Sequence, residues 1–124
     1  MLCSMSLKKL PEISEVDGFE GTKIKQIFHP HNTLNGIRYS ITHFSLEKGK
    51  KSQLHKMKSS EIYYILEGDG ILHVDDDKYQ VSVDDSIYIP PMAKQFIENT
   101  GNSKLKFLCI IDPAWKQEDD ALLE

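Results

Sequence analysis

The feature that most constrains this chain is its rhythm of short β-branched and aromatic runs, each closed by Gly, Asp or Asn. These runs predict strands over eight segments: 23–29, 37–46, 61–66, 71–74, 79–83, 86–89, 95–98 and 105–111. Many short strands at even spacing within 124 residues are typical of one domain, so the sequence predicts an all-β sandwich or barrel.

The N-terminal part of the chain departs from this rhythm. Residues 1–20 have no sustained period, and Pro11 after Leu10 breaks any helix there. We therefore expect residues 1–20 to form an arm and residues 21–112 to form the β domain.

The C-terminal part also departs from it. Residues 113–124 predict a short helix, because Asp112 is a suitable N-cap and Pro113 takes the first helical position. On that helix the acidic residues 118–120 are expected to form a solvated face.

Composition excludes several classes of protein. The 15 basic against 19 acidic residues give a net charge of −4, which argues against a nucleic-acid partner. The longest purely apolar stretch, 107–111, is far shorter than the ~20 residues that span a bilayer. The first ten residues carry their charges after an apolar stretch, the reverse of a signal peptide. Two cysteines, Cys3 and Cys109, indicate free thiols in a reducing, cytoplasmic compartment.

The most informative segment begins at Gly49 and ends at Gly68. Five residues separate Gly49 from His55, three separate Met57 from Glu61, and six separate Glu61 from Gly68. This spacing resembles the first signature of the cupin superfamily, in which a His-x-His pair, a glutamate and a glycine follow a glycine. Met57 stands where that signature has its second histidine.

A second segment, 84–99, resembles the second cupin signature. Pro90 and Asn99 match it, whereas Asp84 and Met92 replace glycines and Gln95 replaces a histidine. The resemblance implies a cupin jelly-roll β-barrel, to which the expected C-terminal helix would be appended.

The resemblance also implies a divalent metal in the barrel lumen, held in most cupins by three histidines and one glutamate. Carried onto this chain, it implies His55, Glu61 and Gln95 as ligands of Fe, Mn, Ni, Zn or Cu. Met57 is expected to pack beside them, because a thioether suits only a soft ion such as Cu(I). His43, on the strand expected before the motif, is either a core residue or the fourth ligand.

A narrower resemblance joins the chain to small cupins often labelled mannose-6-phosphate isomerase-like. The shared segments are 60–68, 89–91, 98–101 and 107–115, together with Gln95. Sugar-phosphate isomerisation would need a phosphate clamp built from lysines here, because Arg38 is the sole arginine.

Three functions remain open from the sequence. In the first, the metal supports an isomerase, lyase or dioxygenase acting on a small polar metabolite, with Glu61 or Tyr63 moving protons. Tyr63 is a candidate because it shares a strand face with Glu61. The alternatives are a non-catalytic barrel that binds a small ligand or senses a metal, and a degenerate dimeric scaffold. Short apolar strands and the unperiodic arm indicate exposed sheet edges, so we expect a homodimer.

Overall fold

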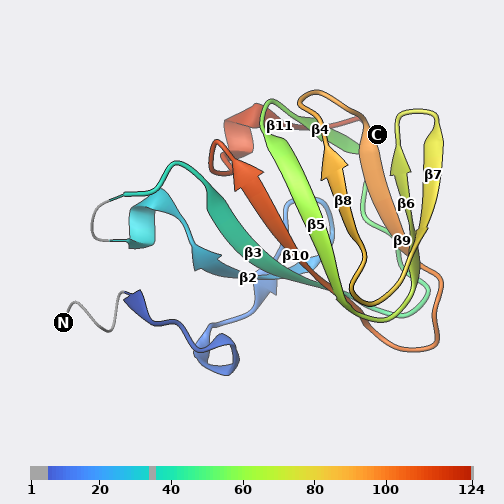
Figure 1. Cartoon of the computed structure of the whole chain (residues 1–124), viewed down its shortest axis with the longest axis horizontal. Coiled ribbons are helices and arrows are strands. Elements are labelled where there is room, and N and C mark those ends of the chain that lie inside the picture. Colours follow the sequence, from blue (N-terminus) through green and yellow to red (C-terminus); the bar gives the residue numbers. More distant parts are fainter. Residues whose placement is uncertain (1–5, 34–35, 124) are drawn as a thin grey trace.

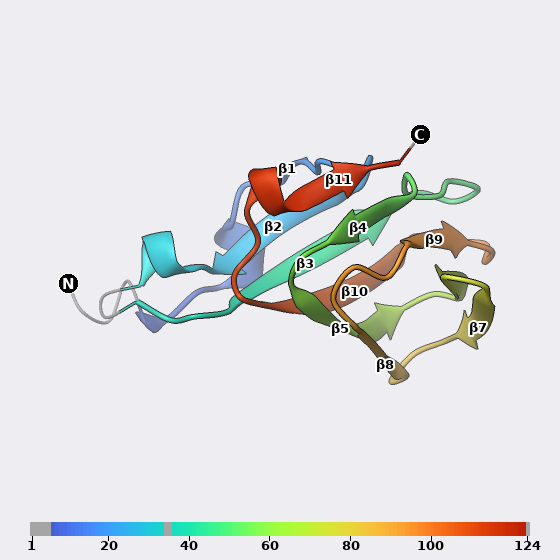
Figure 2. The ribbon, with the colours of Figure 1, turned by 90° about the horizontal axis from the view of Figure 1, so that it is seen from above.

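The chain folds into two antiparallel β-sheets that lie face to face. The computed structural model describes residues 6–33 and 36–123, and Figures 1 and 2 show the two layers from the front and from above. The strands are β1 (Val16–Asp17), β2 (Lys23–Phe28), β3 (Ser40–Leu46), β4 (His55–Met57), β5 (Ser60–Glu67), β6 (Gly70–Val74), β7 (Asp77–Val81), β8 (Ser86–Ile89), β9 (Gln95–Asn99), β10 (Leu105–Asp112) and β11 (Asp120–Leu122). Three 3₁₀ turns accompany them: η1 (Leu10–Glu12), η2 (Pro30–Asn32) and η3 (Gln117–Asp119).

The strand order is that of a jelly roll. One sheet has the order β1-β2-β3-β10-β5-β8 and the other the order β11-β4-β9-β6-β7. β10 therefore lies between β3 and β5, and β9 lies between β4 and β6, so strands distant in sequence pair within each sheet. The predicted all-β jelly-roll barrel is confirmed.

Strand alternation decides which side chains enter the barrel. In β5, Glu61 and Tyr63 are buried whereas Ile62 and Tyr64 are exposed, so the predicted shared face of Glu61 and Tyr63 is confirmed. The rings of Phe44, Phe107 and Tyr63 stack in series, with centroids 5.1 and 5.2 Å apart. This aromatic stack forms the middle of the core.

The C-terminal tail differs from its prediction. Instead of a helix, the tail forms η3 and then β11, which pairs antiparallel with β4. A helix of about ten residues gains little on its own, whereas the edge of β4 offers the tail backbone hydrogen-bond partners. The register places Asp120 opposite Met57, and the Asp120 side chain is buried rather than solvated. The expectation of a solvated acidic face is therefore wrong at Asp120.

The described part of the N-terminal arm joins the edge of the larger sheet beside β2. The two residues of β1 pair with β2, and the Lys25 ammonium donates to the Leu10 carbonyl 3.1 Å away. After β1 the chain turns inward, so that Glu20 and Thr22 are buried between the sheets. The arm thus contributes side chains to the barrel interior, which its lack of periodicity did not indicate.

Two further expectations concern the compartment. Cys109 is free and buried, and Cys3 lies outside the described residues. Within residues 6–33 and 36–123, the structure contains no helix long and apolar enough to cross a membrane. The cytoplasmic location stays a prediction.

Candidate functional site

A cavity of about 80 Å³ lies between the two sheets. One water needs roughly 10–15 Å³, so the cavity has room for several waters or for a ligand of a few non-hydrogen atoms. Aromatic side chains supply much of its wall: Phe19, Phe44, Tyr63, Phe107 and Trp115. Three carboxylates and one imidazole also line it: Glu20, Glu61, Asp120 and His55. This mixture of apolar walls and few polar groups is typical of a small-molecule site.

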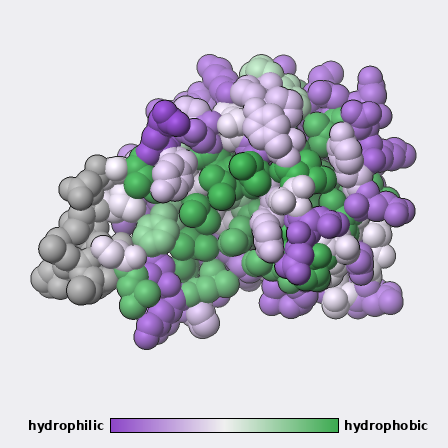
Figure 3. Space-filling view, in the orientation of Figure 1, coloured by the Kyte–Doolittle hydropathy of each residue, from purple (hydrophilic) through white to green (hydrophobic). Residues whose placement is uncertain are grey.

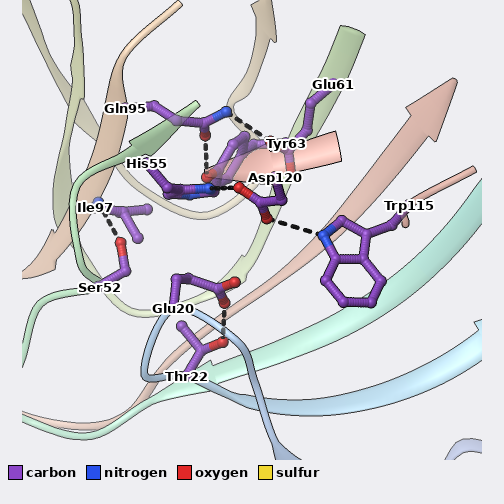
Figure 4. A network of polar contacts seen from close by, with 10 residues as sticks. All are labelled: Glu20, Thr22, Ser52, His55, Glu61, Tyr63, Gln95, Ile97, Trp115 and Asp120. Atoms are coloured by element: carbon purple, nitrogen blue, oxygen red, sulfur yellow. Dashed lines mark hydrogen bonds and ion pairs between the residues drawn. The ribbon is translucent and has the colours of Figure 1, made fainter. Parts of the chain in front are cut away.

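His55 is held in place by the C-terminal tail. Its Nδ1 donates to Asp120 Oδ1 across 2.9 Å, and Asp120 Oδ2 accepts from the Trp115 indole nitrogen, also at 2.9 Å. Figure 4 shows Asp120 between the imidazole and the indole. Because Asp120 fixes Nδ1 as the protonated nitrogen, Nε2 is the atom that remains for a ligand.

The Asp120 carboxylate raises the pKa of the His55 imidazole. Burial by itself lowers the pKa of His55, but the hydrogen bond and charge of Asp120, together with Glu61, outweigh burial and raise the pKa. The buried pair is therefore held together more strongly when the imidazole is charged.

A second chain of hydrogen bonds joins Tyr63, Gln95 and Glu61. The Tyr63 hydroxyl donates to Gln95 Oε1 at 2.6 Å, and Gln95 Nε2 donates to Glu61 Oε1 at 3.0 Å. Both ends of the Gln95 amide are thus occupied inside the barrel, and Gln95 is not one of the residues that line the cavity.

Burial dominates the acid–base properties of this second chain. It raises the pKa of Glu61 to about 7, although the Cys109 thiol, His55 and Gln95 act in the opposite direction. Burial, reinforced by Glu61, raises the pKa of Tyr63 well above its ordinary value. At neutral pH the Tyr63 hydroxyl therefore keeps its proton, while Glu61 is poised between its two forms.

Glu20 is a third buried carboxylate in the cavity wall. Its Oε1 accepts the Thr22 hydroxyl, and no other hydrogen bond to its carboxylate is found among residues 6–33 and 36–123. In the view of Figure 4, Glu20 and Thr22 lie below His55 and Asp120, and Gln95 lies above them. Nothing in the sequence around Glu20 indicated this placement.

His43 is placed away from the other predicted ligands. On β3, Thr42 and Phe44 line the cavity, so His43 between them points to the opposite face of the sheet. Its Nδ1 is buried without a partner in the described part of the chain. Burial and the charge of Lys106 lower the pKa of His43. Of the two roles expected for His43, a core residue or the fourth ligand, its burial outside the cavity lining favours the core residue.

Comparison with known proteins agrees with this architecture. The Cupin_2 family, the cupin domain, matches residues 42–111, more than half of the chain. The chain belongs to this cupin family. The match spans the strands from β3 to β10, and therefore His55, Glu61 and Gln95.

Individual relatives support the assignment. This cupin is 42% identical over 106 residues to the uncharacterized protein MJ1618 of Methanocaldococcus jannaschii, covering 85% of this chain and 84% of that protein. It is 37% identical over 67 residues to an oxalate-binding protein of Thermotoga maritima, covering 53% of this chain and 55% of the relative. The polyketide cyclase RemF from Streptomyces resistomycificus has the same fold, with a TM-score of 0.80 at 14% identity over 95% of this chain and 84% of RemF.

The metal that the cupin fold implies is not matched by the side chains of this cupin. No group of three His, Cys, Asp or Glu able to hold a metal ion occurs among residues 6–33 and 36–123. His55 and Glu61 face the cavity, but Gln95 is committed to Tyr63 and Glu61, and Met57 supplies only a thioether. Transition metals in proteins usually have three or four protein ligands, so these residues do not fit a tightly held ion.

Proposed function

We propose that this cupin binds a small organic ligand in the cavity between its sheets. The observation that carries the proposal is the cavity of about 80 Å³, in which His55 is oriented by Asp120 and presents Nε2. A buried polar nitrogen in a cavity wall is a group that a ligand can satisfy. An oxalate-binding relative at 37% identity supports ligand binding as the class of function, although that match covers only part of each chain.

The proposal is tested by filling the cavity. Thr42 lines the cavity, so Thr42→Phe places a ring in it, whereas Ile41→Phe adds the same ring on the opposite face of β3. Small molecules that copurify with each protein are then identified by mass spectrometry. In parallel, panels of anions, neutral molecules and cations are titrated against the fluorescence of Trp115, the only tryptophan, which lines the cavity.

We expect saturable binding in the wild type and in Ile41→Phe, and its loss in Thr42→Phe. Thermal melts and circular dichroism verify that both variants fold. If Thr42→Phe binds its ligands as the wild type does, or if no compound binds at all, the proposal is wrong.

A second candidate function is acid–base catalysis on the bound ligand, as in an isomerase or lyase. The observation that favours it is the position of Glu61 in the cavity wall with a pKa of about 7, close to the pH at which a proton must be exchanged. In this candidate Glu61 is the catalytic residue, and Tyr63 acts on it through Gln95. Glu61→Gln would then abolish turnover of the identified ligand while leaving its binding within a few-fold.

We also propose that the chain forms a homodimer through the outer face of the larger sheet. Across that face, Ile110 pairs with Ile41 on β3 and with Ile62 on β5, and Ile62 pairs with Tyr88 on β8. Ile62, Tyr88 and Ile110 are exposed. Figure 3 shows hydrophobic side chains gathered on this face, over β10 and β5. Such an exposed apolar row supports a protein–protein contact.

A further inference from the structure

The charge of the cavity discriminates among ligands. Three carboxylates, those of Glu20, Glu61 and Asp120, line it together with one imidazole, that of His55. No lysine or arginine is among the described residues that line it. Three acidic groups thus face a single basic group in the cavity wall, so acidic groups are in excess there. An anionic ligand would therefore meet repulsion inside an environment of low dielectric constant.

Glu20 is a cavity carboxylate with a single hydrogen-bond donor in the described part of the chain. Asp120 accepts from His55 and Trp115, and Glu61 accepts from Gln95. Among the described residues, Glu20 accepts only from the Thr22 hydroxyl. Glu20 is 7% exposed, and no ion pair with it exists among the described residues. A buried carboxylate without a cation is costly, so a positively charged ligand would relieve that cost.

Two aromatic rings flank this carboxylate. Phe19 precedes Glu20 in the chain, and its ring centroid lies 6.1 Å from that of Trp115, with the rings tilted by 56°. Both rings line the cavity. The faces of aromatic rings attract ammonium groups, and this attraction strengthens where water is excluded.

We infer that the ligand of the cavity is a small organic cation, a protonated amine that donates to Glu20 Oε2 and packs against Phe19 and Trp115. This inference rests on the proposed ligand-binding function and specifies the class of ligand. The inferred ligand is a cation, whereas the oxalate-binding relative is named for an anion. Binding needs no metal, because the positive charge is supplied by the ligand itself.

The test uses probes of defined charge. Trp115 fluorescence of the full-length protein is titrated, at constant ionic strength, with methylammonium, ethylammonium and propylammonium chloride. Ethanol serves as the neutral analogue of the middle probe, and sodium oxalate and inorganic phosphate are the anions. We expect at least one ammonium probe to saturate, and ethanol and both anions to bind at least about tenfold more weakly, the factor that one charge-assisted hydrogen bond supplies.

Variants then locate the charge that matters. Glu20→Gln keeps the shape of the side chain and removes its charge, so we expect it to weaken ammonium binding about tenfold, equivalent to about 1.4 kcal/mol. Glu15→Gln is the matched control, because Glu15 is an exposed acid on the same arm. Its affinity should equal that of the wild type. Should Glu20→Gln fail to fold in thermal melts, the wild-type comparison of ethylammonium with ethanol and the anions still decides.

Each contrary outcome has one meaning. Oxalate, phosphate or ethanol binding more tightly than every ammonium probe, with the binding lost in Thr42→Phe, would overturn the inference about charge and leave the luminal site standing. Equal ammonium affinity of a folded Glu20→Gln and the wild type would overturn it as well. If no probe of any charge gives a signal that Thr42→Phe abolishes, both the site and its charge preference are wrong.

Discussion

Replacing Asp120 by asparagine tests the group that joins the tail to the barrel. Asp120 accepts two hydrogen bonds of 2.9 Å, from His55 Nδ1 and Trp115 Nε1, and is 6% exposed. An asparagine has one acceptor oxygen and one donor group at the same positions, so it keeps one of these bonds and loses the other. A hydrogen bond to a charged group contributes about 1.5–3 kcal/mol, so we expect Asp120→Asn to lower the free energy of unfolding by about 2–3 kcal/mol at pH 6.

The pH dependence of this loss follows from His55. Its pKa in the folded protein is raised above the unfolded value of about 6.5, so the resulting stabilisation is fully present below pH 6.5 and disappears as the pH rises through the folded pKa. Above that pKa the imidazole is neutral, and its Nδ1 can accept a hydrogen bond from the asparagine amide. The difference between wild type and Asp120→Asn should therefore shrink to about 1 kcal/mol at pH 9.

The assay is urea unfolding followed by Trp115 fluorescence and by circular dichroism, at pH 6 and pH 9. Asp119→Asn is the control. The Asp119 carboxylate forms a long surface ion pair of 3.8 Å with Lys58, so this change should alter the free energy of unfolding by less than about 0.5 kcal/mol. A loss below about 0.5 kcal/mol for Asp120→Asn at pH 6 would refute the tertiary role of the carboxylate. A loss equal at the two pH values would refute the ionic character of the pair.

Three other expectations can be checked independently. Trp115→Ala should lower the free energy of unfolding by about 3 kcal/mol, because it removes a large ring from the cavity wall; a loss below about 1 kcal/mol would mean that the tail is not docked. Protein purified without a histidine tag should contain less than one equivalent of any first-row transition metal by elemental analysis, even after incubation with Mn, Fe, Co, Ni or Zn. One equivalent of metal that is lost in His55→Ala would show that the cavity side chains do hold a metal ion. Light scattering should report about twice 14.2 kDa for the wild type and about 14.2 kDa for Ile110→Lys, while Val83→Lys, an exposed apolar position elsewhere, should remain dimeric.

The barrel and half of its site could be predicted because they depend on local spacing. A strand has a period of two, so the spacing from Glu61 to Tyr63 determines that they share a face wherever the strand lies. The resemblance to the two signature segments also predicted that His55 and Gln95 come from different strands. Their position as Cα partners in the β4–β9 ladder is a long-range pairing that only the structure shows.

Strand alternation did not predict which way His43 points. Alternation divides β3 into two sets, one with Ile41 and His43 and the other with Thr42 and Phe44. The pattern alone does not say which set faces the lumen, because each set of β3 mixes apolar with polar residues and nearly all of the strand is buried. Phe44 stacks on Phe107 inside the barrel, so the set with Thr42 and Phe44 faces the lumen and His43 lies on the opposite face of the sheet.

The sequence by itself determined the β-strand periodicity, the jelly-roll architecture and the entry of His55, Glu61 and Tyr63 into the barrel. Only the tertiary structure decided what surrounds them, because Glu20 arrives from the arm and Asp120 from the tail. Asp120 lies 65 residues from His55 in the chain and reaches it because β11 pairs with β4. Hydrogen bonding between strand edges creates such neighbours without any local signal, so a residue in an acidic surface-like run became the buried carboxylate that orients the central histidine.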